Sequence, residues 1–159
     1  MKYRKILLTQ DKIALVDIED YKYLNQFKWC AVKDNKNGFF YAARKGKKSL
    51  LRMHRVIMNN PKNMDIDHIN SNSLDNRRKN LRICFRAQNQ MNRGKQLNNT
   101  SGYKGVYWNK VWNKWLSAIN IKKKQKHLGY FPTKEKAALA YNEAAKKYHG
   151  EFARLNVIK

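Results

Sequence analysis

Alternating apolar and polar positions, interrupted by turn residues, predict β-hairpins in the first half of the chain. Residues 6–9 and 13–16 flank the polar turn 10–12, and residues 29–32 and 39–43 flank a turn that ends in Asn37-Gly38. Residues 50–58, which carry His54, follow, and a polar loop then leads to a short strand at 81–84 and a short helix at 86–93. This half of the chain is therefore predicted to be β-rich.

The second half has a simpler pattern. Three aromatic and β-branched runs recur at hairpin spacing: 103–109, 115–121 and 125–131. Thr133 is placed to cap the N-terminus of a helix over 134–149, and Gly150 to end it. Alanines and tyrosines fall on one side of that helix, and small side chains allow a helix to lie close to a sheet. We expect a three-stranded sheet covered by one helix, with this stripe as core.

The segment between the two halves marks a boundary. Residues 96–102 are polar and rich in turn formers. We therefore expect a first domain over 1–95, a linker over 96–102 and a second domain over 103–159, which together make an α+β protein.

The charge of the chain points to an anionic partner. Lys and Arg total 35 against 11 Asp and Glu, a net charge of +24 over 159 residues, and both halves are basic. Duplex DNA offers a dense line of phosphates and gains from the release of its counterions. An anionic membrane is the alternative, but no basic amphipathic helix with a broad apolar face is found. Double-stranded DNA is the expected partner.

Cysteines and apolar runs exclude several classes of protein. Cys30 and Cys84 are far apart and no CxxC occurs, which argues against a disulfide framework or a cysteine zinc ribbon. No apolar run is long enough for a membrane span or a secretory signal. We expect a protein that is not secreted and that resides in a reducing cytoplasm or nucleoid.

A small set of polar residues could hydrolyse a phosphodiester: Asp67-His68, Asn80 and Asn89. Carboxylate and amide oxygens are hard ligands suited to a magnesium-type ion, and a histidine can take a proton from water. Neighbouring residues on a strand point to opposite sides, so Asp67 and His68 need a bent strand end or a bulge to share one site. By composition alone, such residues are more often part of turns than of a catalytic site.

The sequence context of these residues resembles the His-Asn-His (HNH) nuclease motif in its homing-endonuclease form. The matching segments are Met53-His54-Arg55, Asp67-His68-Ile69-Asn70, Leu74-Asp75-Asn76-Arg77-Arg78-Lys79-Asn80-Leu81-Arg82 and Gln88-Asn89-Gln90-Met91-Asn92-Arg93. The resemblance implies a ββα-metal fold over about 53–93, in which two strands clasp a loop and one helix closes the metal site.

The resemblance also implies roles for individual residues. Asp67 and Asn89 correspond to the metal ligands, with Mg²⁺ or Mn²⁺ favoured, and His68 to the general base. Asn80 corresponds to an asparagine that holds the loop through backbone hydrogen bonds. We expect His54 to make a structural hydrogen bond or a phosphate contact. Arg77 and Arg78 form either a solvated charge run or, beside a nuclease loop, phosphate contacts.

The second domain resembles the plant Apetala2/ethylene-response-factor DNA-binding domain over about 101–156. The matching segments are Tyr103-Lys104-Gly105-Val106, Trp112-Asn113-Lys114-Trp115, Leu128-Gly129-Tyr130-Phe131 and the alanine-rich helix. That family lays its sheet in the major groove. Lys104, Tyr107 and Asn120 stand where it usually has arginines and His127 where it often has tryptophan, so the plant target sequence does not transfer. Alternating Lys122, Lys124 and Lys126 are expected to contact phosphates or to protect an edge strand.

The two motifs together predict a site-specific DNA endonuclease of the homing type, acting as a monomer or a homodimer. A DNA-binding regulator with an inactive nuclease motif is the main alternative. An RNA-binding protein that stacks bases on its aromatic residues is a third.

Overall fold

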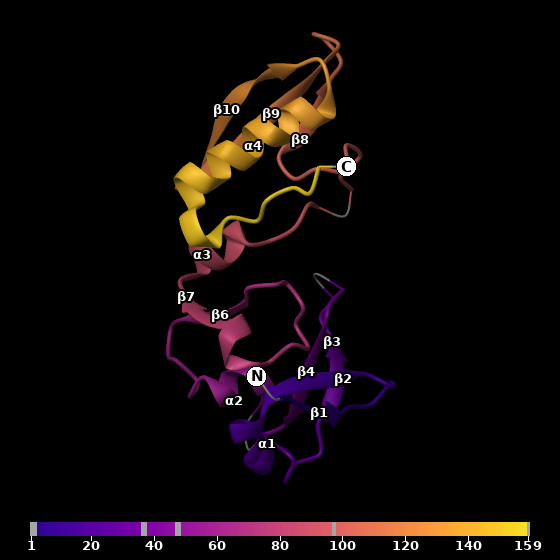
Figure 1. Ribbon diagram of the computed structural model, residues 1–159, viewed down its shortest axis with the longest axis vertical. Helices are drawn as coiled ribbons and strands as arrows, with labels where there is room; N and C mark the ends of the chain where they lie inside the picture. Colours follow the sequence, from indigo (N-terminus) through magenta and orange to yellow (C-terminus); the bar gives the residue numbers. More distant parts are fainter. Residues whose placement is uncertain (1–2, 36–37, 47–48, 97, 159) are drawn as a thin grey trace. The chain divides into compact units, whose positions relative to one another are not determined.

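The computed structural model describes residues 3–35, 38–46, 49–96 and 98–158, and the chain divides into two compact units, Met1–Arg86 and Ala87–Lys159 (Figure 1). The expected linker 96–102, of which Leu97 is outside the described residues, falls inside the second unit. Ser101 is buried there, and its hydroxyl lies 3.0 Å from the Tyr103 carbonyl and 2.9 Å from the Val106 carbonyl. These bonds fold the end of the linker onto the second unit.

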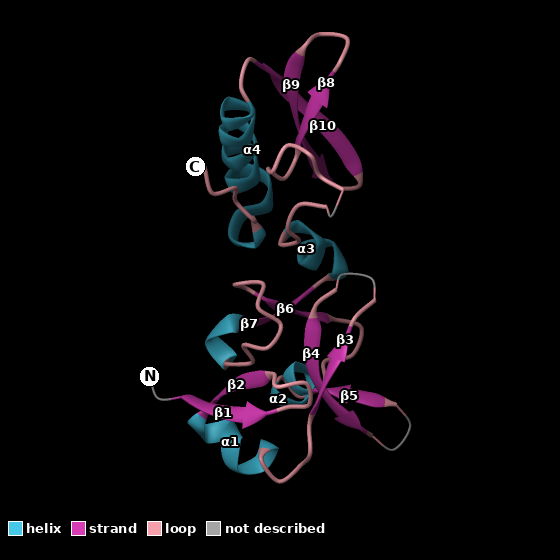
Figure 2. Cartoon of the chain, turned by 90° about the vertical axis from the view of Figure 1, so that its right-hand side faces the viewer, coloured by secondary structure: helices cyan, strands magenta, loops and turns pink. Residues whose placement is uncertain are grey.

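The first unit is built from short antiparallel strands (Figure 2). Strands β1 (Tyr3–Leu7) and β2 (Ile13–Asp17) form a hairpin, and β3 (Cys30–Lys33), β4 (Phe40–Lys45) and β5 (Leu50–Arg52) form a sheet. Strand β6 (Asp65–His68) pairs with β7 (Leu81–Cys84). Both predicted hairpins are confirmed. In the second of them Gly38 has a φ of +74°, whereas Lys36 and Asn37 lie outside the described residues.

Three short helical segments complete this unit: α1 (Ile18–Leu24), α2 (Met53–Ile57) and the 3₁₀ turn η1 (Arg78–Asn80). Helix α1 was not predicted. It buries only Leu24 and therefore leaves little apolar periodicity in the sequence. The acidic residues Glu19 and Asp20 in its first turn were the available signal, because they favour a helix N-terminus.

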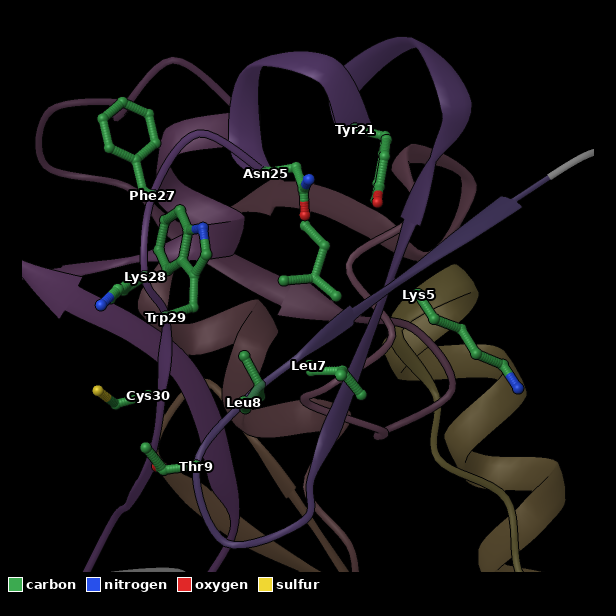
Figure 3. A pocket seen from close by; sticks show the side chains of 11 residues that line it. Lys5, Leu7, Leu8, Thr9, Tyr21, Asn25, Phe27, Lys28, Trp29 and Cys30 are labelled. Carbon is green, nitrogen blue, oxygen red and sulfur yellow. The ribbon is translucent and has the colours of Figure 1, made fainter.

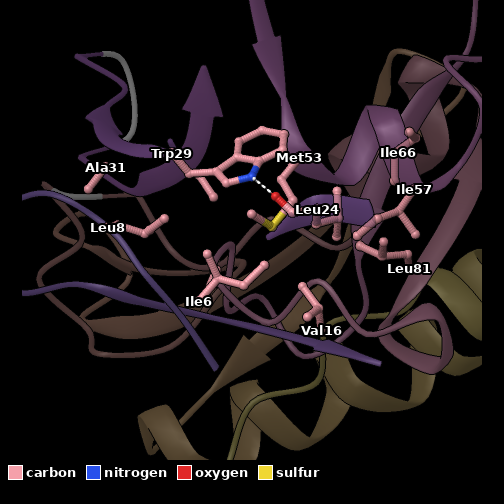
Figure 4. Close-up of a cluster of buried hydrophobic side chains, with 12 residues drawn as sticks. Ile6, Leu8, Val16, Leu24, Trp29, Ala31, Met53, Ile57, Ile66 and Leu81 are labelled. Carbon is pink, nitrogen blue, oxygen red and sulfur yellow. Dashed lines mark hydrogen bonds between the residues drawn. The ribbon is translucent and has the colours of Figure 1, made fainter. Parts of the chain in front are cut away.

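One hydrophobic core joins the early strands to the β6–β7 pair (Figure 4). Its larger members come from six elements and the loop after α1: Ile6, Val16, Leu24, Trp29, Met53, Ile57, Ile66 and Leu81. The Trp29 indole N–H donates to the Leu24 carbonyl at 2.8 Å, which satisfies the polar atom of a buried ring. Because Ile66 and Leu81 flank Asp67 and Asn80 in the sequence, this core also fixes the backbone of the nuclease motif.

A pocket of about 580 Å³ opens beside the β1–β2 hairpin in the same unit (Figure 3). Its lining comes from β1, from α1 and the segment that follows α1, and from the start of β3: Lys5, Ile6, Leu7, Leu8, Thr9, Tyr21, Asn25, Phe27, Lys28, Trp29 and Cys30. None of these residues belongs to the nuclease motif. The pocket is therefore separate from the candidate catalytic residues.

The second unit has the predicted three-stranded sheet and helix. Helix α3 (Arg86–Met91) begins at the unit boundary, and β8 (Val106–Asn109), β9 (Lys114–Ile121) and β10 (Lys124–Phe131) form an antiparallel sheet in the order β10-β9-β8. Helix α4 (Lys134–His149) and the 3₁₀ turn η2 (Gly150–Phe152) follow. The Thr133 hydroxyl accepts from the Lys136 N–H at 3.2 Å, and Gly150 has a φ of +54°, which confirms both predicted helix ends.

Helix α4 packs on one face of this sheet through small side chains. Ala137, Ala138, Ala144 and Ala145 are buried, as the alanine stripe predicted. Tyr141 packs against Gly105, where a Cβ atom would lie 2.2 Å from a ring carbon. Gly105 also has a φ of +74°, so glycine is required there for both its conformation and its size.

The structure also describes the two cysteines and the apolar character of the helices. Cys30 is exposed, Cys84 is buried, and both are free thiols. No helix in the described ranges is long and apolar enough to cross a membrane.

Candidate active site and nucleic-acid surface

Strands β6 and β7 present the Asp67-His68 pair. Their register is continuous over four residue pairs, with Asp67 opposite Arg82 and His68 opposite Leu81. His68 is the last residue of β6, and the chain turns at once, because the Ser71 N–H donates to the His68 carbonyl at 2.8 Å. The pair therefore stands at a strand end, and no bulge interrupts these four pairs; that both side chains serve one site remains a prediction.

Asp67 is buried and ion-paired across the strands. Its Oδ2 accepts from Arg82 Nε at 2.9 Å and from Arg82 Nη2 at 2.7 Å. The Arg82 side chain is itself only 13% exposed. Sequence reasoning included Arg82 in the nuclease motif but gave it no role. The signal was available, because a cation directly opposite a buried carboxylate on a neighbouring strand is a natural counter-ion.

His68 lies in a buried cluster of aromatic rings. Its ring centroid is 5.0 Å from that of His54 and 6.2 Å from that of Tyr41. The Asn76 Nδ2 donates to the Leu74 carbonyl, so Asn76 Oδ1 faces His68 Nε2, at a long 3.5 Å. An oxygen at this position is compatible with the tautomer of the neutral imidazole that carries its proton on Nε2, in which Nδ1 is the acceptor atom.

The environment of His68 favours the neutral form of the ring. Burial lowers its pKa, while the hydrogen bond with Asn76 and the charges of Asp67 and Asp75 act in the opposite direction. A neutral imidazole at neutral pH has the protonation state that a general base requires.

His54, on α2, is a neutral packing partner of His68. Burial, reinforced by His68, Arg52 and Arg55, lowers the pKa of His54 to about 3. Its ring meets those of Tyr41 and His68 edge-on, at 5.8 and 5.0 Å. A ring that is uncharged at neutral pH gives no electrostatic attraction to a phosphate, and the structural hydrogen bond expected for His54 remains a prediction.

Asn80 holds the loop between β6 and β7. Its Oδ1 accepts from the Asn70 N–H at 2.9 Å, and its Nδ2 donates to the Asp75 carbonyl at 2.7 Å. These are backbone hydrogen bonds of the kind expected for this residue. The loop is also attached to β2, because the Leu15 N–H donates to the Leu74 carbonyl and the Asn76 N–H to the Leu15 carbonyl.

Arg77 and Arg78 are both engaged by carboxylates. Arg77 donates to Asp75 at 2.7 and 2.6 Å, and Arg78 donates to Asp20 at 2.9 and 2.6 Å. The second pair spans 58 positions in the sequence and fastens the loop to α1. Phosphate contacts by these arginines remain a prediction, and a phosphate would have to share or displace these carboxylates.

The second expected metal ligand, Asn89, lies on α3. By contacts this residue belongs to the second unit, whereas Asp67 belongs to the first, so their pairing remains a prediction. Among the described residues, no three His, Cys, Asp or Glu side chains gather into a metal cluster.

The sheet of the second unit has one face turned away from α4, which we call the open face. On β9, Trp115 and Ile119 contact the helix clusters, so the intervening residues and their cross-strand partners lie on the opposite face. The open face consists of Tyr107, Asn109, Lys114, Leu116, Ala118, Asn120, Gln125, His127 and Tyr130. It thus brings together three of the predicted DNA-binding residues.

The remaining predicted DNA-binding residues lie elsewhere. Lys124 and Lys126 pair with Ile121 and Ile119, so they project on the helix side, and Lys126 Nζ donates to the Tyr148 hydroxyl at 2.8 Å. Lys122 is in the β9–β10 turn, where its φ is +47°. The expected alternation failed here because Lys122 belongs to the turn and not to the strand.

Lys104 is also turned away from the solvent. Its Nζ donates to the Met91 carbonyl at 2.5 Å and lies 5.9 Å from the centre of the Tyr141 ring. Burial, together with the nearby charges of Arg154 and Arg93, lowers its pKa to about 8. Base contact by this lysine remains a prediction.

Comparison with known proteins identifies both parts of the chain. The HNH endonuclease family matches residues 53–91, and the AP2 domain matches residues 101–151. Protein 3.8 of Escherichia phage T7 is 34% identical over 94 residues, which cover 59% of this chain and 77% of that protein. The uncharacterized HNH endonuclease L560 of Acanthamoeba polyphaga mimivirus is 31% identical over 149 residues, which cover 91% of this chain and 75% of the relative.

A third relative is similar over a shorter stretch. The dehydration-responsive element-binding protein 2A of Arabidopsis thaliana is 39% identical over 66 residues, 40% of this chain but 19% of the plant protein. No solved structure matches the chain. The chain belongs to the HNH endonuclease family and carries an AP2 DNA-binding domain.

Proposed function

We propose that this protein is a site-specific DNA endonuclease of the homing type, with the AP2 sheet as its targeting surface. The observation that carries the proposal is the strand end at which buried Asp67 and His68 follow each other, within the HNH match and on a chain of charge +24. We also propose that its gene belongs to a phage or a mobile intron, and the similarity to a phage protein supports the first of these sources.

In this proposal His68 is the general base. With the proton of the neutral ring on Nε2, its Nδ1 accepts a proton from the water that attacks phosphorus. Asn80 keeps the loop, and with it the strand end at His68, in position through its two backbone hydrogen bonds. Arg82 neutralises the carboxylate of Asp67 in the absence of another cation.

The donor chemistry of the two expected ligands suits a divalent cation. The buried Asp67 carboxylate and the amide oxygen of Asn89 are hard ligands of the kind that Mg²⁺ or Mn²⁺ prefers. Such an ion would neutralise charge on the scissile phosphate and on the leaving 3′ oxygen. We propose Asp67 and Asn89 as its protein ligands, and hydrolysis to a 5′ phosphate and a 3′ hydroxyl as the reaction.

Replacing the proposed base tests this function. Wild-type protein and His68→Ala are incubated with Mg²⁺ and a broad panel of duplex DNA, and cleavage is measured on gels. We expect wild-type cleavage and at least about a 100-fold lower rate for His68→Ala, with duplex binding and thermal unfolding retained as controls. Equal cleavage rates for wild type and His68→Ala would show that His68 is not the general base.

The same experiment separates the alternatives. Duplex binding by folded wild type without cleavage under any divalent ion would favour a regulator with an inactive nuclease motif. Preference for single-stranded RNA over duplex DNA in a competition binding assay would favour the alternative of an RNA-binding protein. One candidate active site per chain is compatible with a monomer that nicks or a homodimer that cuts both strands, and native mass spectrometry with and without DNA distinguishes them.

A further inference from the structure

The open face presents two amide side chains as a pair. Asn120 and Gln125 are directly opposite each other on β9 and β10, and both are exposed. His149, buried under the sheet, binds the Asn120 carbonyl through its Nε2 at 2.9 Å, which holds the backbone at this position. A rigidly supported Asn or Gln can bind the N6 and N7 positions of adenine with two hydrogen bonds in the major groove.

An aromatic and aliphatic surface lies farther along the open face, beyond the Ala118–His127 pair. Tyr107 is 43% and Tyr130 is 42% exposed, with Leu116 between them as the cross-strand partner of both. The Tyr130 ring is 4.7 Å from that of His127 and 6.1 Å from that of Trp112, in the β8–β9 turn. Apolar side chains in the major groove contact the methyl group of thymine.

Charged base readers are missing from the centre of the open face. The sequence from 103 to 131 contains no arginine, aspartate or glutamate, and its charges are all lysines. Arginine or lysine is the commonest reader of guanine, and a carboxylate accepts a hydrogen bond from cytosine N4, so the positions of the lysines decide the matter. Lys114 lies on the open face at its β8–β9 end, and the other lysines lie in the two turns, on the helix side of β10 and, for Lys104, against Met91. None of them lies between the amide pair and the surface of Tyr107, Leu116 and Tyr130.

We propose that the open face selects A·T base pairs in duplex DNA. The Asn120–Gln125 pair binds adenines, and the surface of Tyr107, Leu116 and Tyr130 takes thymine methyl groups. This inference rests on the proposed function, because it requires the sheet to face the major groove. It defines the chemical class of the target, which differs from one read by arginines.

Binding-site selection tests the proposal. The 159-residue protein is used in EDTA, so that the DNA is not cut, and its binding sites are selected from randomised duplexes. We expect an A·T-rich core, an affinity about tenfold lower for each A·T pair changed to G·C, and weaker binding when thymine is replaced by uracil. A G·C-rich consensus, or no effect of uracil, would overturn the proposal.

Variants locate the selectivity within the sheet. Asn120→Ala and Gln125→Ala should each lose about tenfold in affinity for the selected site and little for a site already changed to G·C at the contacted pair. Gln96→Ala, an exposed amide outside the sheet, is the matched control and should change neither value. Lys122→Ala, in the β9–β10 turn, should weaken both sites equally.

The outcomes distinguish the two proposals. Selective binding that ignores both amide substitutions would refute the assignment of A·T readers while leaving the endonuclease proposal intact. Absence of duplex binding by folded wild type would refute the targeting role of the sheet, and this inference with it.

Discussion

At the scale of single residues, the buried Asp67–Arg82 pair differs from the exposed ion pairs of the same chain. The side chains of Asp67 and Arg82 are 7% and 13% exposed, whereas those of Glu143 and Lys146 are 73% and 57% exposed. Removing one partner of a buried pair leaves the other charge uncompensated, which costs far more than losing an exposed pair.

Arg82→Met should therefore lower the free energy of unfolding by about 3 kcal/mol, while Lys146→Met, the matched exposed control, should lower it by less than about 1 kcal/mol. Urea denaturation monitored by circular dichroism measures both. Adding Asp67→Asn to Arg82→Met should recover part of the loss. Similar losses for the two single variants would show that burial does not govern the pair.

His54 makes stability depend on pH. Its pKa is about 3 in the folded protein against an ordinary value of 6.5, so between these values the unfolded chain binds a proton that the folded protein does not. The contribution is complete above pH 6.5 and is lost as the pH falls towards 3, at up to about 1.4 kcal/mol per unit.

His54→Gln should flatten this dependence. We expect urea midpoints between pH 4 and 6 to fall less steeply for the variant than for wild type, by the equivalent of about one proton. Parallel curves would show that His54 is protonated in the folded protein.

At the scale of secondary-structure elements, the packing of α4 against its sheet depends on Gly105. Gly105→Ala would bring a Cβ within 2.6 Å of the Ala118 carbonyl as well as against Tyr141, at a φ of +74°. We expect the free energy of unfolding to fall by about 3 kcal/mol.

Gly102→Ala is the control, because its φ of +85° imposes a similar backbone strain but nothing lies within 4 Å of the new Cβ. It should cost about 1 kcal/mol. Thermal unfolding of the two variants measures the difference. If they unfold alike, the contact with Tyr141 contributes nothing.

Local signals explain which elements could be predicted. Helix α4 has a capping threonine, a terminal glycine and a full alanine stripe, so its bounds followed from the sequence. Helix α1 buries a single residue and was missed. Which face of the sheet Lys124 and Lys126 occupy depends on where the β9–β10 turn falls. The turn residues Lys122 and Lys123 have positive φ, but a Lys-Lys pair is not a turn signal in the sequence as Asn-Gly is.

Long-range partners explain which site features could not be predicted. Asp67, His68 and Asn80 could be named from the sequence because the nuclease motif is recognisable from residues that lie close to them in the chain. The carboxylate that binds Arg78 comes from Asp20 in α1, far away in the sequence. Nothing in the spacing of the arginines shows whether they face phosphates or carboxylates.

At the scale of the whole molecule, positive charge should dominate the affinity for DNA. The net charge is +24, and residues 103–131 carry lysines without a single acidic side chain. Each phosphate neutralised contributes about −0.9 to the slope of log affinity against log salt concentration. We therefore expect affinity to fall steeply with salt.

Lys122→Gln should reduce the magnitude of that slope by about 0.9 if this lysine contacts one phosphate. Fluorescence anisotropy with a labelled duplex at several salt concentrations measures the slope. An unchanged slope would remove Lys122 from the phosphate contacts, and a wild-type slope near zero would contradict the electrostatic origin of binding.

The attachment of the 70–80 loop to β2 has a consequence for protein engineering. Residues 53–91 suffice to identify the nuclease family, yet Leu15 hydrogen-bonds both Leu74 and Asn76, and Asp17 accepts from the Arg78 N–H. A chimeric enzyme that transplanted only the recognisable motif onto a foreign targeting domain would leave these groups without partners. The smallest transferable cutting module therefore has to start at β1, some fifty residues upstream of the motif.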